Sequence, residues 1–420
     1  MKKTSVYPLL FTILLAASSS AQQVLETGGG KMPDEWIDKD THHKIIRLTR
    51  KEGSNSSFYF HNNPFVGNKM VFYSTDKSKG RQIYTVDLKT LAIEQVTSQN
   101  SPMNGEIVGQ KSGNAYYQIR DSVYCTNTKT KQTKLLFVFP ADYKGGISTI
   151  NADETILAGG KASDDQKEIL KKYPEKSQFF DRIFDAHLPN DLFTINIKTG
   201  ELKKIHTENT WLGHVQFSPA DPKLLMFCHE GPWHKVDRIW TINIDTKEVK
   251  LMHKRSMDME IAGHEFFSPD GKTIWYDLQQ PRSVRFFLSG TDVQTGKETK
   301  YEMTRDEWSI HFNISPNQKR FCGDGGNDTQ VAKAKDGMWI YLFQPQGDKF
   351  VSERLVNMKH HQYHLEPNVH FSPDGNWVIF RANFEGEEEV YAVEIANGKR
   401  ETATRDRQRA DSRRQEEAVK

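Results

Sequence analysis

The chain has 420 residues, of which 27% are charged, 36% hydrophobic and 11% aromatic, and it carries a formal net charge of +2. A balance so close to neutral gives no electrostatic reason to expect a nucleic-acid partner, and the composition is that of a polar globular protein. The length alone favours two or three domains, but an internal repeat overrides that expectation.

The first 21 residues have the pattern of a secretory signal peptide. Lys2 and Lys3 precede an apolar run over residues 6–17, and small residues follow up to Ala21. The run is short for a membrane span, and no Cys follows the expected cleavage point, which argues against a lipoprotein anchor. We therefore expect a periplasmic or secreted protein that begins at Gln22 and has no membrane segment.

Only three cysteines are present, Cys125, Cys228 and Cys322. An odd and small number does not make a disulfide framework. We expect them to fill strand interiors as small apolar side chains, although one disulfide among them stays open.

From residue 22 onward the sequence repeats a unit of four short strands. The third and fourth strands, joined by a polar turn, recur seven times, over residues 83–96, 123–137, 192–205, 239–252, 287–303, 338–355 and 390–402. First strands lie upstream of each pair at intervals of about 40 to 67 residues, which suits propeller blades with loop insertions. The pattern predicts an all-β fold, a single seven-bladed β-propeller of WD40-like or TolB-like blades over residues 22–403.

Three segments stand outside the repeat. Residues 44–49 have no first strand of their own, and we expect them to complete the last blade and close the ring. The insertion over residues 161–190 contains a helix-compatible stretch and is either a wall of a binding site or a solvated loop. The highly charged tail over residues 404–420 is expected to be disordered.

One position of the repeat carries polar side chains that can bind ligands. Four Ser-Pro pairs follow a Phe or Ile, and four residues before the Ser of each of them stand His214, His264, His311 and Asn368. First strands line the channel of a propeller, so these side chains should converge on its axis. Each of them could instead bond only to the neighbouring blade, but four at the same phase favour a functional cluster.

The last blade adds more polar residues. His364, Glu366, Asn368 and His370 alternate, and on one strand they would share a face. Imidazole, carboxylate and amide groups together suit Mn²⁺, Zn²⁺ or Ca²⁺. The alternative is a polar channel filled with water.

Several segments resemble the oligogalacturonate lyases, over roughly residues 40 to 395. The most specific segment is the His-Glu-Gly-Pro run at residues 229–232. The other similar segments are residues 44–49, 58–60, 211–214, 227–228, 236–237, Trp240, 264–266, His311 and 323–325.

The resemblance implies a seven-bladed propeller that cleaves short oligogalacturonates from pectin by β-elimination with a divalent metal, typically Mn²⁺. It implies that His264 is a metal ligand from a middle blade. The family's last-blade Gln-x-x-His-x-His run is replaced here by Tyr363, Glu366 and Asn368. We therefore take Glu366, Asn368 and the neighbouring His364 as the remaining candidate ligands.

The resemblance also implies a catalytic His and a charge-neutralising Arg. We assign the base to His214, with His229 as the second candidate. No Arg occupies the family's position, and Arg238 or Arg182 can substitute for it. His61 and His311 are further candidates for substrate binding, alongside Arg182.

The sequence is also compatible with a non-catalytic function. The Ser-Pro-Asp-Gly turns of the blades occur in TolB-like periplasmic propellers, which bind a protein or carbohydrate partner without needing a His cluster. The propeller of a prolyl oligopeptidase-type protease is disfavoured, because the chain has no Gly-x-Ser-x-Gly elbow.

Overall fold

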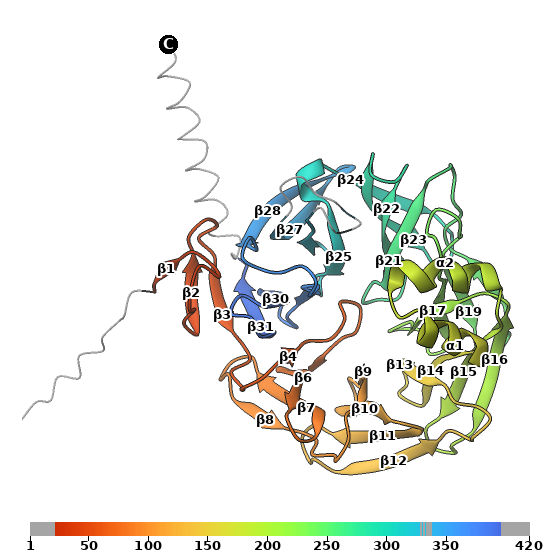
Figure 1. Cartoon of the computed structure of the whole chain (residues 1–420). Helices are drawn as coiled ribbons and strands as arrows, with labels where there is room; N and C mark the ends of the chain where they lie inside the picture. Colours follow the sequence, from red (N-terminus) through yellow and green to blue (C-terminus); the bar gives the residue numbers. More distant parts are fainter. Residues whose placement is uncertain (1–21, 328–329, 331, 333–337, 396–420) are drawn as a thin grey trace, which may run out of the picture.

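The computed structural model describes residues 22–327, 330, 332 and 338–395. The predicted signal peptide and the charged tail lie outside these residues, and the domain boundaries at 22 and 403 stay predictions. Figure 1 shows the strands arranged as a closed ring of blades around a central axis. The prediction of an all-β, seven-bladed propeller is therefore confirmed.

Blades one to four follow each other along the chain, and the strands of each blade are given in order from the axis of the ring outward. Their strands are β4 (Asn55–Ser56), β5 (Phe65–Val66), β6 (Lys69–Asp76), β7 (Gly80–Asp87) and β8 (Ile93–Gln95); β9 (Asn104–Val108), β10 (Asn114–Ile119), β11 (Ser122–Asn127) and β12 (Thr133–Val138); β13 (Gly146–Ile150), β14 (Ile156–Ala162), β15 (Asn190–Asn196) and β16 (Leu202–Glu208); and β17 (Leu212–Phe217), β18 (Leu224–His229), β19 (Ile239–Asn243) and β20 (Val249–Leu251).

Blades five to seven complete the ring. Their strands are β21 (Ile261–Phe267), β22 (Thr273–Gln279), β23 (Phe286–Asp292) and β24 (Glu298–Met303); β25 (Ser309–Ile314), β26 (Phe321–Gly325), β27 (Trp339–Gln346) and β28 (Lys349–Asn357); and β29 (His370–Phe371), β30 (Trp377–Ala382) and β31 (Glu389–Glu394), to which β3 (Lys44–Arg47), β2 (Glu35–Asp38) and β1 (Val24–Leu25) are added. A short 3₁₀ helix, Arg305–Glu307, precedes β25.

The core lies between adjacent blades. Met226 and Ile239 of blade four pack with Ile274 and Tyr276 of blade five, and all four side chains are fully buried. A four-stranded sheet has two faces and cannot bury both without neighbours, so each blade depends on the next. The three cysteines are free and buried in strands, as expected.

The two ends of the described chain close the ring. β3 pairs antiparallel with β31, with Ile45 opposite Val393 and Ile46 opposite Ala392. The expectation that residues 44–49 complete the last blade is confirmed, and the pairing leaves no open joint between the first and last blades.

A half-buried carboxyl at this joint, that of Glu389, is expected to make the stability of the protein depend on pH. Glu389 accepts hydrogen bonds from the Thr49 hydroxyl and from Asn55 Nδ2 (3.2 Å). Burial raises its pKa to about 7, although these two hydrogen bonds act in the opposite direction. The unfolded state therefore loses its proton first, and the wild type should lose stability as the pH rises from about 4.5 to 7.

Glu389→Gln keeps an acceptor for both hydrogen bonds and removes the charge. We expect the urea midpoints of the two proteins to be close at pH 5, with the variant gaining about 1–2 kcal/mol at pH 8, after discounting for partial exposure. Urea unfolding at the two pH values measures this. A difference between the two proteins that does not change with pH would contradict the assignment.

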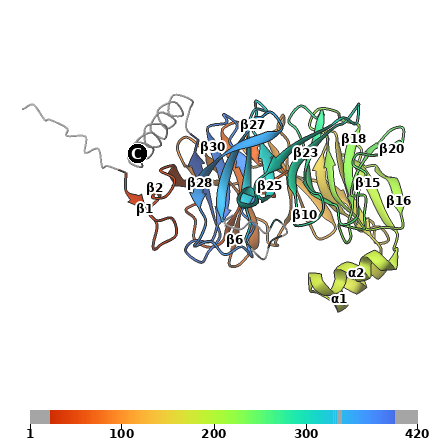
Figure 2. The ribbon, with the colours of Figure 1, turned by 90° about the horizontal axis from the view of Figure 1, so that it is seen from above.

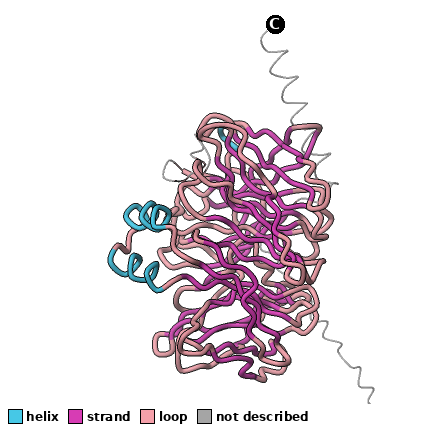
Figure 3. The backbone as a smooth tube through the Cα atoms, turned by 90° about the vertical axis from the view of Figure 1, so that its right-hand side faces the viewer, coloured by secondary structure: helices cyan, strands magenta, loops and turns pink. Residues whose placement is uncertain are grey.

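The insertion of blade three forms two helices that project from one face of the ring (Figures 2 and 3). They are α1 (Asp164–Lys172) and α2 (Lys176–Ala186), between β14 and β15. Ser163 caps α1 by accepting a hydrogen bond from Gln166 N (3.2 Å). Neither these helices nor any other helix in the described chain is long and apolar enough to cross a membrane.

The last-blade segment differs from its expected form. β29 begins only at His370, and residues 364–369 form a turn and an extended stretch without strand pairing. Asn368 has a left-handed backbone, with φ of 50°. The prediction that His364, Glu366, Asn368 and His370 share one face of a strand is wrong, because this backbone reversal breaks the alternation.

Candidate active site

A loop between β4 and β5, residues 57–64, crosses the axis of the ring, and we call it the crossing loop (Figure 1). Two blades hold its main chain at Phe60, whose N–H donates to Asn368 Oδ1 (3.1 Å) and whose carbonyl accepts from Asn313 Nδ2 (3.1 Å). A third blade holds Tyr59, whose N–H donates to Glu106 (2.6 Å). The loop divides the channel into two cavities.

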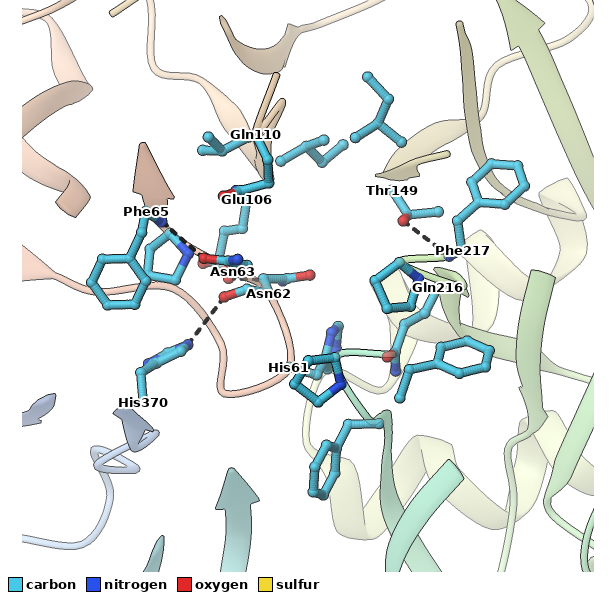
Figure 4. Close-up of a pocket in the computed structure, with 18 of the residues that line it drawn as sticks. His61, Asn62, Asn63, Phe65, Glu106, Gln110, Thr149, Gln216, Phe217 and His370 are labelled. Carbon is cyan, nitrogen blue, oxygen red and sulfur yellow. Dashed lines mark hydrogen bonds between the residues drawn. The ribbon is translucent and has the colours of Figure 1, made fainter. Parts of the chain in front are cut away.

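The larger cavity, of about 650 Å³, lies where the inner strands end. It is lined by the Phe and Pro residues of the repeated motif, such as Phe217 and Pro219, and by the crossing loop. Figure 4 shows this cavity, with His370 Nε2 donating to the carbonyl of Asn62 (3.1 Å) at its edge.

The smaller cavity, of about 260 Å³, lies where the inner strands begin. Its lining is Tyr59, Lys176, His214, Glu230, Trp233, Arg238, His264, Ile310, Gln330 and Glu366.

The topology explains this lining. Inner strands of a propeller all run in one direction, so the loops before the first strand and between the second and third strands reach the same face. Lys176 follows β14, Trp233 follows β18, Gln330 follows β26, and Glu366 precedes β29. The helical insertion therefore forms part of the wall of this cavity.

Bulges aim two of the repeated His residues into the cavity. The register of β17 with β18 shifts between Gly213 and Gln216, and that of β21 with β22 shifts between Gly263 and Phe266. His214 and His264, at these shifts, have left-handed φ angles of 46° and 50°. A bulge re-aims a side chain away from the regular alternation, which is its common use beside functional sites.

His264 is held by a carboxylate behind it. Its Nδ1–H donates to Asp277 Oδ1 (2.7 Å), and both side chains are almost fully buried. Burial lowers the pKa of His264, but the charge and hydrogen bond of Asp277 outweigh it and raise the pKa overall. A Cβ at Gly263 would lie 3.3 Å from the Asp277 carboxylate, so the glycine makes room for this contact.

His311 repeats the same arrangement in the next blade. Its Nδ1–H donates to Asp324 Oδ2 (2.8 Å), its ring centre lies 4.9 Å from that of His264, and it is fully buried. Its Nε2 has no hydrogen-bond partner in the described structure, and Glu366 Oε2 lies 3.6 Å away. A buried nitrogen of this kind has lost its hydration and needs a ligand.

These groups fit a divalent metal. A carboxylate on Nδ1 fixes the tautomer of a His and leaves Nε2 as the ligand atom, and here this occurs twice, beside the Glu366 carboxylate. Among the described residues, no three His, Cys, Asp or Glu side chains are already gathered as a metal cluster. A cation would therefore take His264, His311 and Glu366 as its protein ligands and complete its coordination with other oxygen atoms.

His214 has the properties of a base. It lines the cavity, and burial lowers its pKa below 6.5, which keeps the imidazole neutral at pH 7. Its Nδ1 lies 3.5 Å from Glu265 Oε1, without a hydrogen bond. Glu265 is ionised, because Arg238 and His214 outweigh its burial and lower its pKa to about 2. A carboxylate at this distance stabilises the imidazolium that forms when His214 takes up a proton.

Arg238 lines the cavity but is committed to two carboxylates. Its Nε donates to Glu265 (2.9 Å) and its Nη1 to Glu230 (2.8 Å), and the side chain is 3% exposed. Because two anions already balance its charge, it has little capacity to neutralise a third. Arg182 lines neither cavity. It donates to the Gln178 carbonyl and lies over the Tyr173 ring.

The other predicted residues lie outside the smaller cavity. His229 contacts Glu208 (3.1 Å) and stacks on Trp240, and His364 is exposed. Asn368 is fully buried and holds the crossing loop. His61 lines the larger cavity, and burial and the nearby His214 lower its pKa to about 3.

The sequence did not single out Tyr59, Lys176, Trp233 or Gln330. Each lies on a connection between strands, and only Tyr59 stood in a segment already compared with a family. Lys176 lies in the insertion over residues 161–190, one of whose two expected roles was a wall of a binding site. Tyr59, Trp233 and Gln330 lie in loops, for which the strand repeat predicts no position.

The comparisons with known proteins agree with this architecture. The family model described as oligogalacturonate lyase matches residues 34–399. The oligogalacturonate lyase of Dickeya dadantii is 25% identical over 377 residues, covering 86% of this chain and 95% of that protein. The oligogalacturonide lyase of Pectobacterium atrosepticum is 24% identical over 389 residues, covering 87% and 98%.

Two solved structures share the fold. An oligogalacturonate lyase in complex with manganese superposes with a TM-score of 0.76 at 23% identity, covering 87% of this chain and 96% of that one. An oligogalacturonate lyase from Vibrio parahaemolyticus gives a TM-score of 0.73 at 22% identity, with the same coverage. Because the family model spans most of the sequence, this chain belongs to the oligogalacturonate lyase family.

Proposed function

We propose that this protein cleaves short oligogalacturonates by β-elimination in the smaller cavity, assisted by a divalent metal, Mn²⁺ in the first instance. The observation that carries the proposal is the meeting of a neutral His214 and a carboxylate-anchored His264 in one cavity of about 260 Å³. A second carboxylate-anchored imidazole, His311, is buried directly behind the cavity wall, with its ring centre 4.9 Å from that of His264. Membership of the family, and the manganese complex of a protein with the same fold, support it.

The chemistry requires a base and a cation. The proton at C5 of a uronate becomes acidic only when charge can develop on the adjacent carboxylate, as in an enediolate. A bound divalent cation supplies that stabilisation, and His264, His311 and Glu366 are the residues that would hold it. Arg238 is a weaker candidate for this task, because the charges of Glu230 and Glu265 already balance its own.

His214 then takes the C5 proton. It is neutral at pH 7 and faces the same cavity, and a positioned imidazole of this kind typically contributes about 10² to 10⁴ in rate. Glu265, 3.5 Å away, stabilises the resulting imidazolium. The C4–O4 bond breaks as the double bond between C4 and C5 forms, and the product is a 4,5-unsaturated uronate.

The proposal also includes the cellular location of the protein. The signal-like residues 1–21 support action in the periplasm or outside the cell. Fractionation of cells that express the full chain, with N-terminal sequencing of the product, tests this. An intact N-terminus in the cytoplasmic fraction would contradict it.

The activity assay is direct. Purified protein with Mn²⁺ and digalacturonate should form an ultraviolet-absorbing unsaturated product, visible by absorbance and mass spectrometry. Trigalacturonate and a glucuronate-containing disaccharide test the substrate range. Absence of product with every uronate and several divalent metals would leave the non-catalytic, TolB-like alternative, in which the propeller only binds a partner.

Lys176 should bind the substrate rather than act in the chemistry. It is an exposed cation at the cavity wall, with Nζ 5.6 Å from the Trp233 ring centre. An exposed pair with a uronate carboxylate is worth up to about 1 kcal/mol, so Lys176→Ala should raise KM about threefold to fivefold with kcat little changed. Lys172→Ala, on the neighbouring helix and outside the cavity, is the control. Steady-state kinetics on trigalacturonate separate the two constants, and an unchanged KM would contradict the role.

A further inference from the structure

Tyr59 is a proton-bearing side chain to which the mechanism above assigns no task. It lies on the crossing loop, is half-buried and lines the smaller cavity. Its ring centre is 6.0 Å from that of His214 and 5.3 Å from that of His311. The hydrogen bond from its main-chain N–H to Glu106 Oε2 (2.6 Å) fixes the loop at this point.

The phenolic hydroxyl of Tyr59 has no hydrogen-bond partner in the part of the chain that the structure describes. Two buried tyrosine hydroxyls are used in structure: Tyr276 bonds to Thr291 (2.9 Å), and Tyr117 bonds to Thr126 (2.9 Å). The hydroxyls of Tyr143 and Tyr363 also lack a partner among the described residues, but neither residue lines the smaller cavity. A tyrosine hydroxyl left unbonded at a cavity wall is available to a ligand.

The proposed elimination needs such a group. In a galacturonide the C5 proton and the C4 oxygen lie on opposite faces of the sugar ring, so the base that removes one cannot protonate the other. His214 comes from the wall formed by blade four, whereas Tyr59 comes from the loop that separates the two cavities. Two groups from different elements can flank one sugar.

We propose that Tyr59 donates the proton to the departing glycosidic oxygen, an inference that rests on the proposed lyase function. The C5–H bond breaks toward His214, its electron pair forms the C4=C5 bond, and the C4–O4 bond breaks. O4 takes the phenolic proton and leaves as a hydroxyl. His214 is then an imidazolium and Tyr59 a phenolate.

His214 and Tyr59 return to their starting protonation states without another reactant, because the two side chains lie close together. When the product leaves, the proton on His214 returns to the Tyr59 oxygen, directly or through one water, because the two ring centres are 6.0 Å apart. Burial raises the pKa of the Tyr59 phenol above its ordinary value of about 10, so the group is protonated at neutral pH and ready for the next cycle.

The test compares two leaving groups in the Tyr59→Phe variant. Phe keeps the ring that packs against His214 and His311 and removes only the hydroxyl. On digalacturonate, whose leaving oxygen needs a proton, kcat/KM should fall about 10²-fold or more. On methyl 4-deoxy-4-fluorogalacturonide, which loses fluoride and gives the same unsaturated ring, it should fall less than about threefold, since fluoride needs no general acid. Thermal unfolding checks that the variant is folded.

His214→Gln is the matched comparison, because loss of the base should slow both substrates. Equal losses of Tyr59→Phe on the two substrates would overturn the role of Tyr59, and so would no loss on either.

The wild type provides a second measurement that does not depend on a variant. A solvent deuterium effect on kcat/KM should be larger for digalacturonate than for the fluoride substrate, and equal effects would also overturn the role. A wild type that forms no unsaturated product from digalacturonate contradicts the proposed function itself, whereas an active wild type with either adverse result contradicts only the role of Tyr59.

Discussion

Replacing His214 by Gln is expected to lower kcat/KM for digalacturonate by about 10² to 10⁴-fold, the usual contribution of a general base. His214 faces the cavity, is neutral at pH 7 and is free of hydrogen bonds at Nδ1. Gln fills a similar volume but accepts no proton at this pH. Initial rates of unsaturated product formation measure the effect.

The matched control is His229→Gln in the same blade. His229 contacts Glu208 and stacks on Trp240, and it does not line the cavity. It should keep activity within a few fold of the wild type. A large loss in this variant, with His214→Gln active, would move the base from His214 to His229.

The pH profile gives an independent check on the same assignment. Burial lowers the pKa of His214 from its ordinary 6.5. A base is active in its unprotonated form, which is present above its pKa, so kcat/KM should stay level as the pH falls through 6.5 and decline only at lower pH. A decline centred above 6.5 would contradict the assignment.

Removal of the His264 imidazole is expected to abolish metal binding and nearly all activity. His264→Ala deletes one anchored nitrogen and leaves Asp277 buried without its partner. Asp277→Asn keeps the imidazole and removes the carboxylate behind it, which typically costs about 10- to 100-fold in metal affinity. Elemental analysis and titration of Mn²⁺ into metal-free protein measure both effects without reference to catalysis.

His364→Ala is the control for the metal site. His364 is exposed and lies outside the cavity, so the variant should bind Mn²⁺ as the wild type does. Treatment of the wild type with a chelator should remove activity, and added Mn²⁺ should restore it. Full activity of the chelated protein, or loss of metal in His364→Ala with retention in His264→Ala, would contradict the assigned ligands.

The fold of this protein could be predicted from the local pattern of its sequence. Each blade repeats the same alternation, and blades four to seven also share a Ser-Pro turn after the inner strand. The strands, the number of blades and the closing pairing of residues 44–47 with β31 therefore follow from the spacing along the chain. The repeat also brought His214 and His264 to notice, because identical positions in identical blades point to one axis.

The chemistry of the site depends on contacts that the repeat does not encode. A bulge at each of these two His residues interrupts the regular alternation. Asp277 and Asp324 reach the imidazoles of His264 and His311 from the neighbouring strands. The left-handed backbone of Asn368 turns that amide from the cavity to the crossing loop.

Site residues on the segments that connect the strands were the hardest to predict from the sequence. Tyr59 and Lys176 reach the smaller cavity from a loop and a helix that have no counterpart in the other blades. The repeat in the sequence was therefore sufficient for the ring of blades, since strand pairing and interblade packing follow a short periodic pattern. The assembly of the site was decided by tertiary structure, because its side chains come from segments that lie far apart in the sequence and meet only near the axis of the ring.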